Sequence, residues 1–225
     1  LALVCMKVCK HDAWLQPKHW KLPNRVQLKH SIGYATLSLT AAGPSELDKM
    51  LAVKLLPLGV SGLYAAASRV IGAATLPVTA LLLSALPRLF RQAGEHSAQS
   101  QRLNRWIYLS VLIYGLALAG LLWFAAPAVQ WLFGSQYQGM GDMLRWLCIA
   151  VPGLVLRLTV ASILMTQGKP WLRAGFEVFG MATLAIAAFA LYPQFGAKGM
   201  ALALAISEWG MVLAGVFFIL KVRRN

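Results

Sequence analysis

Long apolar segments alternate along this chain with short turns and with clusters of basic residues. The hydrocarbon core of a bilayer, about 30 Å thick, requires roughly 20 apolar residues in a helix that crosses it. Six segments fit this pattern, at about residues 30–56, 60–90, 106–126, 143–166, 172–192 and 198–220. The first is the weakest, because Gly43 and Pro44 interrupt it. The pattern predicts an all-α, polytopic transmembrane helix bundle in which short turns make neighbouring spans antiparallel.

The segments before the first span are expected to differ from the bundle. Residues 1–9 are apolar but too short to span, and they lack the basic region and cleavage site of a signal peptide. We therefore expect them to be the tail of a truncated transmembrane helix, with further apolar helices upstream. Residues 10–29 are polar and basic and contain Pro17 and Pro23. They are predicted to form a cytoplasmic loop ahead of a six-span bundle at 30–225.

The composition excludes an ordinary soluble domain. Hydrophobic residues make up 59% of the chain and charged residues 12%, and the mean hydropathy is +0.63. A net charge of +14 is also typical of nucleic-acid binding proteins. The distribution of the charge argues against nucleic acid as a partner, because 15 of the 21 basic residues flank the spans on one side, as in cytoplasmic loops.

These 15 residues are Lys7, Lys10, Lys18, Lys21, Arg25, Lys29, Arg88, Arg91, Arg102, Arg105, Lys169, Arg173, Lys221, Arg223 and Arg224. The loops on the other side carry only Lys54 and Lys198. Aromatic residues at both sets of span ends fit interfacial belts, namely Trp106 and Trp171 inside and Trp123, Trp131, Tyr192 and Phe195 outside. We therefore predict a multi-pass membrane protein with a cytoplasmic C-terminus.

Small residues four positions apart predict where helices approach one another closely. They occur at Gly62/Ala66, Gly115/Ala119 and Gly199/Ala203/Ser207. Such pairs indicate a packed bundle and carry no information about cargo.

No catalytic signature is present. The sequence lacks the phosphate-binding GxxxxGK[ST], the zinc-protease HExxH and the hydrolase GxSxG motifs. All four histidines, His11, His19, His30 and His96, fall in cytoplasmic flanks, and Cys5, Cys9 and Cys148 have no metal-binding spacing. We therefore expect neither an enzyme nor a cofactor nor a metal site.

Ionisable residues inside the spans are the candidate functional residues, because each is costly in a bilayer unless it faces a polar interior. Arg69, Arg157 and Glu208 lie deepest. Two deep guanidinium groups favour an anionic ligand, since arginine binds phosphate through paired hydrogen bonds. The alternative is a buried ion pair, either Arg69–Glu208 or Arg157–Glu208.

Other charged residues in the spans have simpler expected roles. Lys49, Lys54 and Arg145 can extend to the outer interface. Glu177 can pair with Lys169 or Arg173 nearby. Pro77, eight residues beyond Arg69, is a candidate hinge for access switching or alternatively a fixed kink.

The order of these features resembles the Wzx-type O-antigen and polysaccharide flippases, the oligosaccharide flippase family. That family belongs to the superfamily that includes the MATE multidrug exporters and the lipid II flippases. Three stretches carry the resemblance, at residues 45–92, 131–153 and 195–208. The matching positions in the first stretch are Asp48, Gly62, Tyr64, Ala67, Arg69, Pro77, Pro87 and Arg91.

The resemblance implies one six-helix lobe, the C-terminal one, of a two-lobe transporter, with residues 10–29 as the inter-lobe loop. It implies export of an undecaprenyl-diphosphate-linked oligosaccharide across the bacterial inner membrane by alternating access, for lipopolysaccharide O-antigen, capsule or exopolysaccharide biosynthesis. Arg69 and Arg157 would then meet the diphosphate, Tyr64 would line the cavity, and Asp48 or Glu208 would carry a coupling H⁺ or Na⁺. The implied partners are the lipid-linked oligosaccharide, membrane lipid, the missing N-terminal lobe, and polysaccharide polymerase and chain-length proteins.

Three other classes of protein remain as rivals. An ion-coupled drug exporter of the MATE type would need acidic groups in its cavity. A membrane-embedded glycosyltransferase or ligase would need a large outer loop with catalytic groups, whereas the longest one, about 127–142, holds a single carboxylate, Asp142. A scaffold subunit would not need deep ionisable residues.

Overall fold

The computed structural model describes residues 43–92, 98–166 and 170–224, together with 24, 25, 27, 28, 31, 32, 35 and 36. The chain divides into two compact units, Leu1–Ala35 and Thr36–Asn225, and every helix discussed below belongs to the second. The predicted helix tail at residues 1–9 and most of the predicted loop at 10–29 lie outside the described residues. Their boundaries stay predictions.

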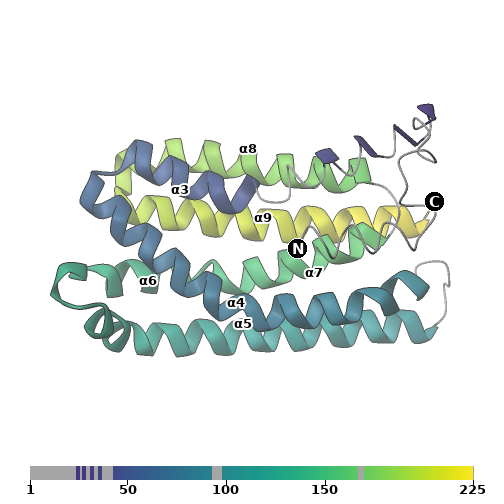
Figure 1. Ribbon diagram of the computed structural model, residues 1–225, viewed down its shortest axis with the longest axis horizontal. Helices are drawn as coiled ribbons and strands as arrows, with labels where there is room; N and C mark the ends of the chain where they lie inside the picture. Colours follow the sequence, from purple (N-terminus) through teal and green to yellow (C-terminus); the bar gives the residue numbers. More distant parts are fainter. Residues whose placement is uncertain are drawn as a thin grey trace, which may run out of the picture. The chain divides into compact units, whose positions relative to one another are not determined.

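The described part of the second unit is helical throughout, which confirms the all-α class (Figure 1). Seven α-helices and one short 3₁₀ helix follow one another: α3 (Gly43–Leu55), α4 (Leu58–Gln92), α5 (Ala98–Phe133), η3 (Ser135–Tyr137), α6 (Met140–Cys148), α7 (Val151–Thr166), α8 (Pro170–Phe195) and α9 (Ala197–Arg224). Pro44 lies in the first turn of α3, where its missing N–H costs nothing.

Four of these helices are long and apolar enough to cross a membrane, at Leu58–Pro87, Arg105–Phe133, Trp171–Phe195 and Ala197–Phe218. A fifth span results if α6 and α7, which meet at a 50° bend, are counted together. Within the predicted first span, 30–56, the structure describes α3 and the helical positions 31, 32, 35 and 36, and the 13 residues of α3 are by themselves too few to cross a bilayer. The described residues therefore contain four to five candidate spans, and a sixth stays a prediction.

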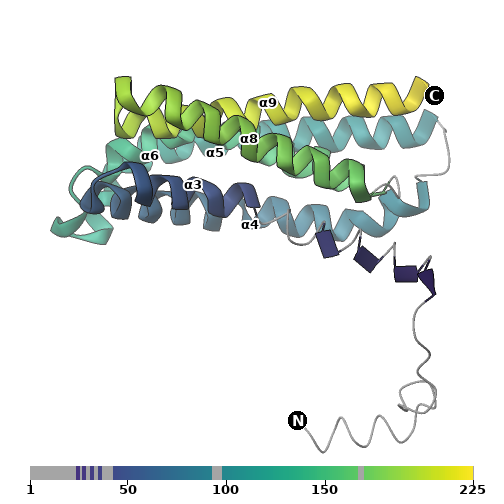
Figure 2. The ribbon, with the colours of Figure 1, turned by 90° about the horizontal axis from the view of Figure 1, so that it is seen from above.

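The helices run antiparallel, as the short turns predicted (Figures 1 and 2). The turns between α3 and α4, α5 and α6, and α8 and α9 gather at one end, while α9 ends at the other. Glycines with positive φ make two of these turns: Gly134 and Gly139 between α5 and α6, and Gly196 between α8 and α9. The backbone N–H of Gly196 donates to the carbonyl of Tyr192 at 2.8 Å and ends α8 tightly.

Small residues bring the helices together at some of the predicted positions. A Cβ atom at Gly199 would lie 2.5 Å from the carbonyl oxygen of Leu191 on α8, and one at Gly115 would lie 3.1 Å from Cα of Pro152 on α7. Gly62, in contrast, has no atom within 4 Å of such a Cβ, so the predicted close approach at Gly62 is wrong within this unit. Gly180, which the pattern missed, packs directly against Met211.

The α8–α9 contact gives a direct test of this packing. Gly199→Ala is expected to destabilise the bundle by about 1–3 kcal/mol, because the added methyl group meets backbone that cannot rotate away. Gly210→Ala on the same helix is the matched control, since no atom lies within 4 Å of a Cβ there. The thermal midpoint of the protein in detergent is the measurement. Equal midpoints for the two variants would contradict the close approach at Gly199.

Candidate functional site

Four charged residues, three of them buried and Arg173 partly buried, form a continuous chain of ion pairs across α7, α8 and α9. The Nε atom of Arg157 donates to Oε2 of Glu208 at 2.6 Å, and its Nη1 atom lies 3.4 Å from Oε2 of Glu177. Glu177 also contacts Arg173, with Nη2 of the arginine 2.6 Å from Oε1 of the glutamate. We call Arg157, Arg173, Glu177 and Glu208 the charge network; its two cations balance its two anions.

The charge network is deep inside the unit. Glu177 is 0% exposed, Glu208 3% and Arg157 5%. Removing a charge from water costs several kcal/mol unless a partner compensates for it, so the arrangement depends on mutual neutralisation. Of the two ion pairs considered from the sequence, Arg157–Glu208 is present. Glu177 pairs with Arg173, one of its two expected partners, while Lys169 lies outside the described residues.

A second buried polar pair joins α3 to α4. The hydroxyl of Tyr64 donates to Oδ2 of Asp48 at 3.3 Å, and the backbone N–H of Lys49 donates to Oδ1 at 2.7 Å. Asp48 is 4% exposed and Tyr64 0%, and the tyrosine ring packs in the main hydrophobic core. Asp48 thus has neutral hydrogen-bond donors, whereas Glu208 has a cation.

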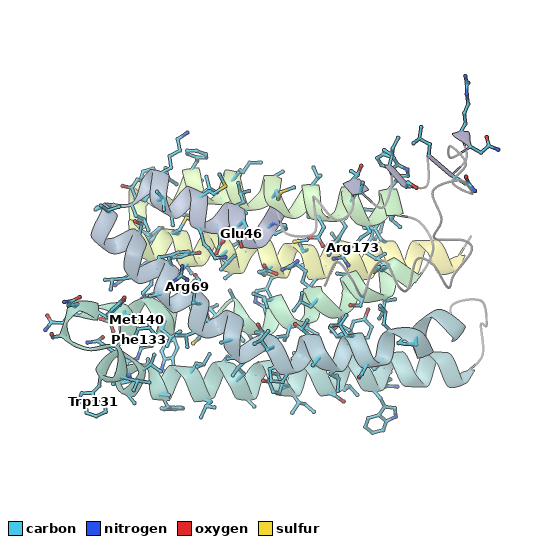
Figure 3. The ribbon with its side chains drawn as sticks, viewed as in Figure 1. Glu46, Arg69, Trp131, Phe133, Met140 and Arg173 are labelled. Atoms are coloured by element: carbon cyan, nitrogen blue, oxygen red, sulfur yellow. The ribbon has the colours of Figure 1, made fainter. Side chains whose placement is uncertain are left out.

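Arg69 differs from the charge network in both exposure and partners. It is exposed on α4 and forms no ion pair with any residue that the structure describes. Gly62 and Gly72 on the same helix are exposed as well, and a Cβ at either would meet no atom within 4 Å. Figure 3 shows Arg69 in the half of the bundle that holds Trp131 and Met140, whereas Arg173 lies in the other half. The guanidinium of Arg69, which has no described ion-pair partner, therefore lies on the exposed side of α4 near two exposed glycines.

Pro77 lies within α4, which continues as one helix through both Pro77 and Pro87. Proline has no N–H to offer to the carbonyl of Ala73 one turn earlier. Close to this interruption, the hydroxyl of Tyr114 on α5 donates to the carbonyl of Ala74 at 2.8 Å. Sequence reasoning did not single out Tyr114, because tyrosine is common in apolar helices. A hinge at Pro77 stays a prediction.

The remaining candidates lie near the surface. Lys49 pairs with Glu46 at 3.0 Å and Arg145 with Asp142 at 3.4 Å, and pairs as exposed as these contribute little to stability. No group of three His, Cys, Asp or Glu side chains suited to a metal ion occurs in the described part of the chain. The four predicted flanking histidines are outside that part. Cys148 is buried as a free thiol.

Apolar helices packed around buried ion pairs define this unit as a polytopic membrane helix bundle. The sequence model of the lipid II flippase MurJ family matches residues 19–224, so the chain belongs to that family. The resemblance to its superfamily is thereby confirmed, while the Wzx-type family itself is not shown. No curated protein matches the sequence significantly. The family consists of transporters rather than enzymes.

Solved structures of MATE transporters share the fold. An outward-facing multidrug resistance transporter of the MOP superfamily has a TM-score of 0.75 at 14% identity, covering 96% of this chain and 52% of that one. A MATE point mutant has a TM-score of 0.76 at 14% identity, covering 100% and 55%. A mutant of the Vibrio cholerae transporter VcmN has a TM-score of 0.75 at 20% identity, covering 99% and 52%. The chain spans about half the length of each.

Proposed function

We propose that the complete protein translocates a polyprenyl-diphosphate-linked saccharide across the bacterial inner membrane by alternating access, and that this chain supplies one lobe. The observation that supports the proposal is the free guanidinium of Arg69, eleven residues into α4. At 1.5 Å per residue it lies about 16 Å along the helix, too deep to face lipid without a large cost. We therefore propose that it faces a polar cavity between the two lobes of the complete protein, where a diphosphate can accept its paired hydrogen bonds.

Lipid II is the first cargo to test, because the family to which the chain belongs is named for it. The resemblance to the O-antigen flippases makes an O-antigen, capsule or exopolysaccharide precursor the second. Both cargoes present the same kind of diphosphate to Arg69, so they differ in the group attached to the diphosphate. The charge network limits the role of Arg157 in binding the headgroup, because the guanidinium of Arg157 already has two carboxylate partners. Arg157 could bind the headgroup only after its release from Glu208.

Asp48 is the better of the two predicted carriers of a coupling ion. Glu208 is neutralised by Arg157, while the Asp48 carboxylate accepts hydrogen bonds from the neutral Tyr64 hydroxyl and Lys49 backbone only. A buried carboxylate without a salt bridge has a stronger reason to take up H⁺ or Na⁺ than one paired with an arginine. We therefore place ion coupling at Asp48.

Helix α5 supports the proposed placement in the membrane. Trp106 and Trp131 are 60% and 83% exposed and are 25 positions apart. That separation is about 37 Å along the axis and nearly seven full turns, so both rings lie on one face. Ile113 and Phe124, also exposed, lie between them on the same face. An apolar stripe bounded by tryptophans fits one bilayer thickness. With the C-terminus in the cytoplasm, Trp131 lies at the outer interface of the membrane. A C-terminal reporter detected outside the cell would show that the protein has the opposite orientation.

A MATE-type drug exporter is the second candidate, favoured by the shared fold and by the buried carboxylates of Asp48, Glu177 and Glu208. Two of these carboxylates are neutralised by arginines, and Arg69 would repel an organic cation. These charges favour an anionic cargo over a cationic drug.

The test uses the full-length protein in proteoliposomes, supplied in separate assays with fluorescent lipid II, an undecaprenyl-diphosphate-linked O-antigen unit and the organic cation ethidium. Runs with a proton or a sodium gradient identify the coupling ion. We expect one of the two lipid-linked saccharides to cross and ethidium not to be transported. Efflux of ethidium alone would replace the proposal with drug export.

A further inference from the structure

The bend between α6 and α7 has a local chemical cause. Pro152, in the first turn of α7, has no N–H for the carbonyl of Cys148, and its ring crowds that carbonyl. The last turn of α6 tightens instead, and the N–H of Ala150 donates to the carbonyl of Leu147 at 3.0 Å. The two helices then diverge by 50°. Such a break frees backbone groups that a membrane cannot satisfy with water.

Glu208 and Trp209, two consecutive residues of α9, form hydrogen bonds with the segment on either side of this bend. The indole Nε1 of Trp209 donates to the carbonyl of Ile149 at 3.3 Å, and Glu208 accepts from Nε of Arg157 at 2.6 Å. Between these levels, a Cβ atom at Gly153 would lie 3.2 Å from Cβ of Glu208 and 3.3 Å from Cδ1 of Trp209. Glycine at position 153 therefore allows α9 to approach closely.

The three contacted positions on the bent segment, Ile149, Gly153 and Arg157, are four residues apart. On a helix that spacing places them along one side. Trp209 thus binds the backbone at Ile149, directly after α6, while Glu208 binds Arg157 on α7 about two turns further on. Because α6 also packs against α4 and α5, its angle sets the position of the turn at Gly139.

We propose that Trp209 is a positioning residue whose indole N–H, together with the adjacent Glu208, fixes the angle of the α6–α7 bend. The pair of residues couples the charge network at mid-depth to the end of the lobe where α5 and α6 connect. An event that releases Arg157 from Glu208 loosens α7, and the angle of α6 changes with it. The transport consequence of this coupling rests on the proposed function, whereas the bend itself can be measured without cargo.

The test compares Trp209→Phe, which keeps a ring and removes the N–H donor, with Trp123→Phe on α5 as the matched control. Trp123 is 44% exposed, similar to the 38% of Trp209. Both changes are made in the full-length protein with its native cysteines replaced by alanine. Spin labels at Asp142→Cys on α6 and Ala190→Cys on α8, both exposed positions, report the angle through their distance distribution.

Trp209→Phe is expected to shift the balance of bend conformers by roughly three- to twentyfold, the range expected for one interhelical hydrogen bond in a membrane. Glu208→Gln should shift the distribution in the same direction, and Trp123→Phe should leave it unchanged. An unchanged distribution in Trp209→Phe, even with a lower thermal midpoint, would overturn the proposal, as would an equal shift in Trp123→Phe. If the shift occurs but no lipid-linked saccharide crosses, the positioning role stands and the transport proposal fails.

Discussion

Replacing Arg157 with alanine is expected to destabilise the lobe by about 3–5 kcal/mol, the cost of leaving a buried charge without its partner. Glu208 would keep no cation among the described residues, and Glu177 would keep only Arg173. Both glutamates are almost completely buried, so water cannot take over the role of the guanidinium. The fraction of folded full-length protein during denaturation in detergent gives the measurement.

Arg145→Ala is the matched control for this loss, because Arg145 is also paired with a carboxylate but at an exposed site. Its cost should stay below about 1 kcal/mol. Arg157→Met combined with Glu208→Leu should recover much of the stability, since the remaining Glu177 keeps its contact with Arg173. A double variant no more stable than Arg157→Ala, or a large loss in Arg145→Ala, would show that the charge network does not act through paired burial.

The sequence predicted the helical class and most spans because hydrophobicity and length decide whether a helix crosses a bilayer. It did not resolve the fourth span, predicted as 143–166, where the structure has α6 and α7 with a bend between them. Pro152 and Gly153 were visible in that span, but proline occurs in straight and bent membrane helices alike. Whether it bends depends on how the neighbouring helices pack around it, and here Trp209 of α9 donates to the carbonyl of Ile149 at the bend.

The deep charges were also visible, because an ionisable residue stands out in an apolar run. Which of these charges pair with one another could not be predicted from the sequence. Arg69 on α4 and Glu208 on α9 each lie eleven residues into their helix, and both helices start at the same end of the bundle. Depth alone therefore allowed Glu208 to meet Arg69 as well as Arg157. The rotation of each helix about its axis decides between them, and rotation follows from packing of the whole lobe. The structure turns Arg157 toward Glu208 and leaves Arg69 on the surface.

That difference in exposure predicts opposite consequences for the two arginines. Arg69→Ala is expected to leave stability within about 0.5 kcal/mol of the unchanged protein, because no described partner loses a contact. Translocation of a diphosphate-linked saccharide should fall by roughly ten- to a hundredfold, the loss expected when hydrogen bonds from a charged donor are removed. The measurement is the rate in proteoliposomes alongside the thermal midpoint of the same preparation.

Two further variants separate a specific headgroup contact from a general effect of positive charge. Lys54→Ala removes an exposed cation at the end of α3, and it should leave the rate unchanged if the position of the guanidinium matters. Arg69→Lys keeps the charge but loses the paired donors, so it should recover only part of the rate. Equal losses in Lys54→Ala and Arg69→Ala would mean that the surface charge attracts the cargo without a defined site. A normal rate in Arg69→Ala would remove the main support for an anionic cargo, since Arg157 is engaged by Glu208 and Glu177.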